Sequence, residues 1–411
     1  MRKIIDECFF QIQNGANIKQ GKVDGGFPIT RIETIANDRF NRDRMGYAGI
    51  TDLSKYESYI LEDEDLLMSH INSMQYLGRT VLYKKQDDEI IIHGMNLLRL
   101  RANRDIIIPG YAKYYFYGHS FRSQLRNIMK KSVNQASFAV KDLKKIKMEI
   151  PCLREQQKLV QVLDKIQKII DVKTKEIAKF DELVSARFVE MFGDPIMNPK
   201  GWNVVTIKDI VTEVRYGTSK PAVEGGKYPY LRMNNLTLNG QLDLKNLKYI
   251  DIPDEEIEKC VVRKGDVLFN RTNSIDLVGK TAVFNLVEDM VIAGYIIRIR
   301  LNEKLLPEVF SQYMNLKALK DVLRAMAKGA VNQANINAQE LQSIKVYLPD
   351  MDIQKQFIKI KDQIDKSKFV IHKFLYCTTH NTKSIIKPRL NTKESGKNKG
   401  RETTCRRILT F

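Results

Sequence analysis

The sequence predicts an α+β protein with an internal repeat, in which two mixed α/β domains alternate with two long helices that pair antiparallel as a coiled coil. Three observations lead to this prediction. The string Val-Asn-Gln-Ala occurs at 133–136 and again at 331–334, 198 residues later (331 − 133 = 198). Its neighbours repeat at the same spacing. Each copy then closes with apolar residues spaced as in a helix that packs against another helix.

The repeat extends well beyond the shared string. At the offset of 198, Gln156 meets Gln354. Further upstream the offset becomes 201 (266 − 65 = 201), and residues 65–80 align with residues 266–281. Six residues of the first block have an identical partner in the second: Asp65, Leu67, Asn72, Ser73, Gly78 and Thr80. A two-copy repeat of this length indicates an internal pseudo-dimer rather than a solenoid.

The first three-quarters of each copy is rich in short β-branched runs broken by Gly, Pro and Asn. Such runs predict strands joined by loops. Helical structure is expected within 112–131 in the first copy and within 308–328 in the second. The predicted domains are residues 1–150 and 194–349.

The last quarter of each copy has heptad spacing. The apolar stripe of the first copy is Leu159, Leu163, Ile166, Ile170, Ile177, Phe180, Val184 and Met191. That of the second copy is Ile353, Phe357, Ile360, Ile364, Ile371 and Phe374. Lys173 and Arg187 would fill the gaps in the first stripe, and Ser367 the gap in the second. These patterns predict helices over 151–193 and 350–380. Because a stripe this narrow needs another helix, the two are expected to pair; the alternative is that each folds back on its own domain.

Composition and charge favour a cytoplasmic, nucleic-acid-binding protein. The chain has 411 residues and a formal charge of +19, and its five cysteines form no Cys-x-x-Cys pair, as expected in a reducing compartment. No apolar run approaches the ~18–20 residues needed to cross a bilayer. The last segment, 381–411, holds nine basic and two acidic residues (9 − 2 = +7), which leaves +12 on residues 1–380 (19 − 7 = 12). A body this basic attracts a polyanion, unless the charge serves solubility alone.

Catalytic motifs are missing from the sequence. The string "VGKT" at 278–281 imitates the end of a phosphate-binding loop, but Ser274 stands where its leading glycine should be. The histidines lack metal-ligand spacing. The chain is therefore expected to bind rather than to catalyse. Two alternatives remain: a self-standing DNA methyltransferase or nuclease with an unfamiliar site, and a coiled-coil scaffold with no role on DNA.

Taken together, these residues resemble the DNA-specificity subunit of type I restriction-modification enzymes. Both copies carry an aromatic-Pro-x-x-Arg motif ending at Arg31 or Arg232, followed by the Asp-x-Leu block that leads to a glycine. The Asn-Gln string, Leu-x-x-Ile, a proline and a glutamine follow in order. The resemblance covers residues 1 to about 375. It implies two target-recognition domains, each reading one part of a split, asymmetric double-stranded DNA target, with the helix pair as a spacer.

The resemblance also implies partners. Two methylation subunits carrying S-adenosylmethionine would dock on the exposed sides of 152–192 and 352–376, and translocase-nuclease subunits would join them for restriction. No cofactor is expected in this chain, and no membrane association. One departure stands out: the repeat stops near Phe374, and the basic tail 381–411 is expected to be disordered. It would act as a non-specific DNA tether or reflect an altered reading frame.

A domain that reads DNA needs base-edge donors and phosphate cations on loops, and Asn or Gln can form paired hydrogen bonds with adenine. The candidates in the first copy are Asn17, Lys19, Arg31, His70, Asn72, Arg79, Asn134 and Gln135. Those in the second are Ser219, Lys220, Arg232, Asn234, Asn235, Arg271, Asn273, Lys280, Asn332 and Gln333. Two structural alternatives stay open. Arg31 and Arg232 could each pair with a strand acid, and the Asn-Gln string could tie down a loop, with Asn337 and Glu340 forming a helix capping box.

Overall fold

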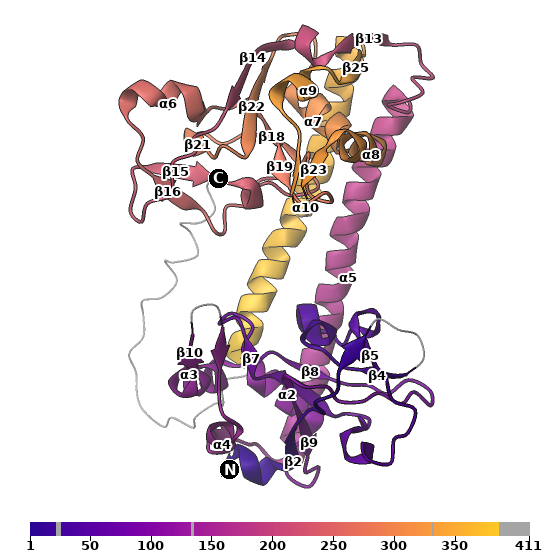
Figure 1. Ribbon diagram of the computed structural model, residues 1–411, viewed down its shortest axis with the longest axis vertical. Helices are drawn as coiled ribbons and strands as arrows, with labels where there is room; N and C mark the ends of the chain where they lie inside the picture. Colours follow the sequence, from indigo (N-terminus) through magenta and orange to yellow (C-terminus); the bar gives the residue numbers. More distant parts are fainter. Residues whose placement is uncertain (22–25, 133–134, 331–332, 386–411) are drawn as a thin grey trace. The chain divides into compact units, whose positions relative to one another are not determined.

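The computed structural model describes residues 1–21, 26–132, 135–330 and 333–385 (Figure 1). These residues form two compact units. One contains Met1–Lys173 together with the chain from Lys373, and the other contains Thr174–His372. Each unit holds one of the two repeated domains, so the domains are described in turn.

The first domain is built on a four-stranded antiparallel sheet. Its strands, in order, are β2 (Phe9–Asn14), β9 (Leu97–Ala102), β6 (Leu66–Ser69) and β8 (Thr80–Leu82). Smaller sheets comprise β3 (Gln20–Gly21), β5 (Gly46–Ala48) and β4 (Phe27–Ile29); β10 (Lys130–Lys131), β11 (Ala136–Ser137) and β7 (Ile71–Asn72); and β1 (Arg2–Ile4) with β12 (Lys147–Glu149). The helices are α1 (Ile5–Cys8), α2 (Pro109–Tyr117), α3 (His119–Ile128) and α4 (Val140–Lys144), with 3-10 turns η1 (Ile32–Asp38), η2 (Arg42–Arg44) and η3 (Glu57–Tyr59).

The second domain is built on an equivalent sheet. Its strands, in order, are β14 (Val211–Tyr216), β22 (Ile296–Leu301), β18 (Val267–Asn270) and β20 (Thr281–Val283). The other sheets comprise β16 (Lys248–Ile250), β15 (Tyr228–Leu231), β21 (Met290–Ile292) and β17 (Val261–Val262); β19 (Thr272–Asn273), β24 (Gln333–Asn335) and β23 (Lys328–Ala330); and β13 (Asn203–Thr206) with β25 (Lys345–Leu348). The helices are α6 (Asp254–Cys260), α7 (Pro307–Asn315), α8 (Lys317–Met326) and α9 (Ala338–Gln342), with 3-10 turns η4 (Ile207–Asp209) and η5 (Met233–Asn235).

The two domains correspond strand for strand in their central sheets, which confirms the repeat predicted from the sequence. The predicted helical segments are also confirmed, as α2 with α3 and as α7 with α8. In each domain the apolar face of the sheet packs on this helix pair: Phe116 and Phe121 are buried against β6 and β9, as Phe310 and Leu323 are against β18 and β22. The peripheral sheets differ, because the second domain has a four-stranded sheet where the first has three strands and isolated bridges at Ile92.

A buried glutamine joins each domain to the helix that follows it. In the first copy, Gln156 donates from Nε2 to the carbonyls of Ile106 and Pro151 and accepts the N–H of Ile108, at 2.9, 3.0 and 2.8 Å. Gln354 makes the same three bonds in the second copy, with Lys304, Pro349 and Leu306. Both side chains are fully buried, so each amide satisfies backbone groups that water cannot reach. This is the physical reason that the glutamine recurs in the repeat.

The two long helices are α5 (Leu153–Phe192), of 40 residues, and α10 (Met351–Ile385), of 35 residues. Within the second unit they lie side by side (Figure 1). The rings of Phe188 and Phe357 have centroids 5.2 Å apart, and Asp181 forms an ion pair with Lys368. Residue numbers fall along α5 as they rise along α10, so the pair is antiparallel, as predicted. The alternative also holds in part, because Leu159 of α5 packs on the core of the first domain.

The structure corrects three of the positions that were predicted to lie in the apolar stripes. Arg187 is exposed, and the next residue, Phe188, is buried in the seam instead. Ser367 is likewise exposed, while Lys368 is buried and reaches Asp181. Phe374 was assigned to the stripe but is 44 % exposed. A strict heptad count drifts from the true helical period of 3.6 residues, so errors of one residue are expected at the gaps. Residues 386–411 of the predicted tail lie outside the described part of the chain.

Candidate nucleic-acid interface

A small sheet in each domain brings together two of the repeated motifs. In the first domain β7 pairs with β11, so Asn72 lies opposite Ala136 of the repeated string. In the second domain β19 pairs with β24, and Asn273 lies opposite Ala334 in the same register. The motif order along the chain therefore reflects contact in space. Of the candidates in the string, Asn134 and Asn332 lie outside the described residues, whereas Gln135 and Gln333 are exposed.

The Asn side chains of this sheet are held by local bonds. Asn72 accepts the N–H of Ser73 at 2.7 Å, and Asn273 accepts that of Ser274 at 2.9 Å. Asn273 also donates to Asn270 Oδ1 at 2.8 Å. These bonds orient both amides. The predicted capping box is confirmed in the second copy, since Asn337 Oδ1 accepts the N–H of Glu340 at 2.9 Å and the Glu340 carboxylate accepts that of Asn337.

The arginines of the aromatic-Pro-x-x-Arg motif bond to neutral groups. Arg31 donates to Gln20 Oε1 at 2.6 Å and to the carbonyl of Gly21. Arg232 donates to the carbonyl of Asn246 at 3.1 Å. Among the described residues neither arginine forms an ion pair with a strand acid, which the sequence had left open as an alternative. A residue without a side chain, Gly46, makes room for the Arg31 guanidinium, because a Cβ placed there would lie 2.4 Å from its Nε.

Two candidates of the second domain lie inside it. Asn235 is 2 % exposed, accepts the N–H of Arg232 and donates to the carbonyl of Asp243. Lys280 is 5 % exposed and donates to the carbonyl of Met233 at 2.6 Å, and burial lowers its pKa. These internal bonds indicate that both residues stabilise the fold of the domain. The equivalent of Lys280, Arg79, is half-buried in the first domain and pairs with Asp38 at 3.0 Å.

Of the other candidates, His70 and Arg271 are half-buried, and several more are exposed. Asn17 and Lys19 are exposed in the first domain, and Ser219 and Asn234 are exposed in the second. Lys220 forms an ion pair of 2.9 Å with Glu256.

Two exposed cations were not among the residues predicted from the sequence. Lys130 and Lys131 are exposed on β10, the strand that pairs with β11 beside Gln135. The repeat itself carried the signal, because Lys130 aligns with Lys328 at the offset of the shared string (328 − 130 = 198). They add positive charge next to the candidate amides.

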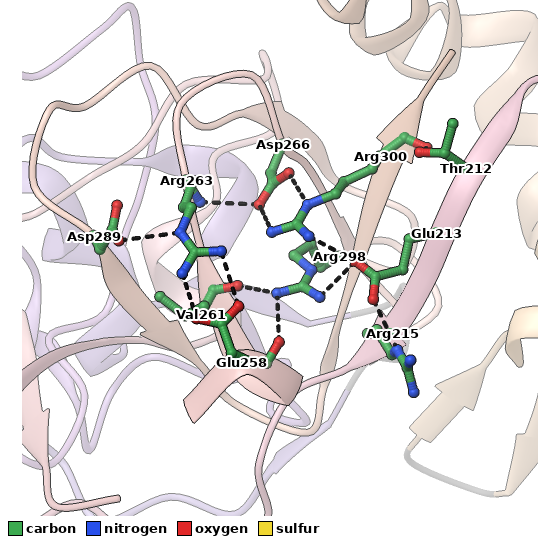
Figure 2. Close-up of polar contacts among 10 residues, drawn as sticks. All are labelled: Thr212, Glu213, Arg215, Glu258, Val261, Arg263, Asp266, Asp289, Arg298 and Arg300. Atoms are coloured by element: carbon green, nitrogen blue, oxygen red, sulfur yellow. Dashed lines mark hydrogen bonds and ion pairs between the residues drawn. The ribbon is translucent and has the colours of Figure 1, made fainter. Parts of the chain in front are cut away.

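A network of charges fixes the strand that leads to this sheet in the second domain. Figure 2 shows the guanidinium groups of Arg298 and Arg300 converging on Glu213, while the Arg300 guanidinium and the backbone N–H of Arg263 both donate to Asp266. Burial would raise the pKa of Glu213, but the neighbouring guanidinium groups outweigh it and hold that pKa below its usual value. Because Asp266 opens β18, the network anchors the strand that ends beside Arg271.

Two further features, a metal site and a membrane-spanning helix, are absent from the described part of the chain. Within it, no three His, Cys, Asp or Glu side chains come close enough to hold a metal ion. Nor does any helix in that part combine the length and apolar character of a membrane span.

Comparison with known proteins matches both copies of the repeat. The family described as "Type I restriction modification DNA specificity domain" matches residues 7–180 and again residues 199–375. The chain is 30 % identical over 377 residues to the type I restriction enzyme MjaX specificity subunit of Methanocaldococcus jannaschii, covering 86 % of this chain and 84 % of that one. It is 22 % identical over 364 residues to the EcoKI specificity subunit of Escherichia coli, covering 83 % and 76 %.

A solved structure has the same fold. It comes from a study of complex assembly and conformational transition in a type I R-M system, and it matches 94 % of this chain and 96 % of its own with a TM-score of 0.53 at 16 % identity. The motif order and the repeated domain with its closing helix point to the same family as the two matched segments. The chain therefore belongs to the type I restriction-modification DNA specificity family.

Proposed function

We propose that this chain is a DNA-recognition subunit in which each domain reads one part of a split, asymmetric double-stranded target. One observation carries the proposal: the two domains present different side chains from the same backbone frame. His70 in the first domain and Arg271 in the second follow equivalent strands. A shared frame indicates a shared task, and a different lining indicates a different DNA sequence.

The proposed limits follow the repeat. Residues 1–150 and 194–349 are the two target-recognition domains, 151–193 and 350–380 are the spacer helices, and 381–411 is a basic tail. The exposed and half-buried candidates carried forward as DNA contacts are Asn17, Lys19, His70, Asn72, Gln135, Ser219, Lys220, Asn234, Arg271, Asn273 and Gln333, with Lys130 and Lys131 added. Arg31, Arg79 and Arg232 are proposed to support the loops around them, because their hydrogen bonds and ion pairs are internal.

The helices are proposed to dock two methylation subunits, which would carry S-adenosylmethionine, with translocase-nuclease subunits joining for restriction. Support comes from a second apolar row on α5, away from the buried stripe. Val162, Ile169 and Val172 are 48 %, 46 % and 54 % exposed. Apolar side chains in helical register favour a partner helix or groove.

Reconstitution tests this division of labour. The purified chain, a methylation subunit from the same source and S-adenosylmethionine are combined with DNA, and methyl transfer is measured. The chain alone should transfer no methyl group, whereas the complex should methylate DNA in a sequence-dependent way. Turnover by the chain alone, with S-adenosylmethionine or Mg²⁺, would instead support the self-standing enzyme.

A pair of variants tests the docking surface. Val162→Asp and Ile169→Asp place charge on the exposed row, and we expect each to weaken assembly with the methylation subunit by at least about tenfold. Val287→Asp is the matched control, since Val287 is 86 % exposed on a loop of the second domain. Equal assembly of all three variants would remove the α5 row as a docking surface.

A further inference from the structure

The residue that follows strand β6 in the first domain, or β18 in the second, is held by the same backbone bond in both. The carbonyl of His70 accepts the N–H of Phe138 at 3.2 Å, and the carbonyl of Arg271 accepts that of Ile336 at 2.9 Å. Each residue also precedes the strand that pairs with the repeated string. The backbone around this position is therefore held in the same way in both domains, while the side chains, His70 and Arg271, differ in charge and in the number of hydrogen-bond donors.

The Arg271 guanidinium is held in place without an acid. Its central carbon lies 4.9 Å from the centre of the Tyr216 ring, and Nη1 donates to the carbonyl of Gly294 at 3.4 Å. Nε is buried and has no hydrogen-bond partner among the residues that the structure describes. Within the same residues, no carboxylate forms an ion pair with this side chain. The buried Nε cannot reach a base edge, so Nη2 and the second N–H of Nη1 are the donors left for an acceptor outside the domain.

His70 gives the first domain a different group at this place. Burial lowers the pKa of His70, opposed by a hydrogen bond with the backbone of Asn96, and so favours the neutral form of the ring. Its Nδ1 is buried without a partner among the described residues, and its ring meets Phe138 edge-on at 6.4 Å. A neutral imidazole offers one donor and one acceptor, whereas a guanidinium offers only donors.

Building on the function proposed above, we propose that this position distinguishes the two parts of the target, with Arg271 reading a guanine through O6 and N7. An arginine fork fits these two acceptors, and this is the commonest specific contact in the major groove. Phosphate oxygens would offer the same acceptor chemistry. The stacked ring and the carbonyl restrict the plane of the guanidinium, which favours a planar base edge. His70 makes a different contact in the other part of the target.

Selection of bound duplexes from a randomised pool tests the proposal. The full-length wild-type chain is compared with Arg271→His, Arg271→Lys and the reciprocal His70→Arg. We expect the wild type to enrich guanine at one position, and Arg271→His to lose that preference by about tenfold while other positions keep theirs. Arg271→Lys should keep affinity and salt dependence but lose discrimination. His70→Arg should add a guanine preference in the other part of the target.

Arg324→Ala is the control, because Arg324 is a partly exposed arginine of the same domain that pairs with Asp321 on its own helix. A uniform loss of affinity across all sequences, with a salt slope reduced by about one, would assign Arg271 to a phosphate and overturn the proposal. Unchanged preferences in all three variants would overturn it as well. If the wild type enriched no fixed sequence, the function proposed above would fail instead. Should Arg271→His not fold, the lysine and reciprocal variants still decide.

Discussion

The central sheets of the two domains carry the same buried arginine with different partners. In the first domain Arg99, 1 % exposed, donates to Gln11 and Gln13 at 2.6 Å, and the nearest carboxylate oxygen, on Asp65, is 3.9 Å away. In the second domain Arg298 donates to Glu213 at 2.8 Å. The register places Glu213 where the first domain has Gln11.

Comparing the two sheets separates the contacts that both share from those that differ. The aspartate that opens the second central strand pairs with an arginine in both domains, Asp65 with Arg101 and Asp266 with Arg300. The residues around that pair have changed from amides to charges without altering the strand order. The pair and the buried glutamine of the helix junction are thus the shared frame, and the neighbouring side chains are free to differ.

The largest expected effect comes from breaking the part that the domains share. Gln354→Leu leaves one backbone N–H and two carbonyls unsatisfied in a buried site, which we expect to destabilise the second domain by about 3 kcal/mol. Gln156→Leu should cost the first domain a similar amount, because its three bonds are equivalent. Hydrogen exchange read peptide by peptide would report each domain separately. A cost confined to one of the two variants would show that the junctions are not equivalent.

A smaller effect is expected from exchanging the partners of the buried arginine. Glu213→Gln gives the second domain the amide of the first and removes an acid from Arg298 and Arg300, which should destabilise it by about 2 kcal/mol. Gln11→Glu makes the opposite change and should stabilise the first domain by about 1 kcal/mol, since Arg99 gains a nearby charge. Urea unfolding of both variants measures the two values. Destabilisation by both changes would mean that each sheet has adapted to its own partner.

The smallest expected effect concerns pH. Lys320 takes the place of Arg122, and burial, together with Arg324 and Lys280, lowers the pKa of Lys320 to about 7. The unfolded chain keeps this proton up to about pH 10.5, so it binds more protons than the folded domain above pH 7, and stability rises with pH. The gain should be about 1 kcal/mol between pH 7 and pH 8.

Lys320→Met should abolish that rise. The unfolding free energy of the wild type and of the variant is measured at each pH, and the difference between the two should change by the predicted amount. Arg122→Met in the first domain is the matched control and should show no such pH dependence, because arginine stays charged throughout this range. A rise of the same size in Lys320→Met would place its origin elsewhere.

The sequence predicted the fold because its signals were periodic and duplicated. The heptad residues indicated the helix pair, and the recurrence of Gln156 as Gln354 marked the junction that the structure shows. The gap residues were misplaced by one position, since Phe188 and Lys368 enter the seam through the drift between heptad and helical periods.

The candidate site was harder to predict, because residue type alone does not reveal burial. Asn235 and Lys280 have the chemistry of DNA contacts, but they bond to backbone carbonyls inside the domain. For Arg31 and Arg232 the sequence left open an acid partner, and the structure places neutral groups beside them. Lys130 and Lys131 were not among the predicted contacts, although the repeat aligns Lys130 with Lys328, because residue type did not indicate the hairpin that brings them beside the string.

The most direct test of the account is the DNA sequence that the wild-type chain selects, bound to its methylation subunits, from a pool of randomised duplexes. Two domains of one architecture with different linings predict two short fixed blocks at a constant separation, neither of which is the reverse complement of the other. A single block, or two blocks that form a palindrome, would contradict it.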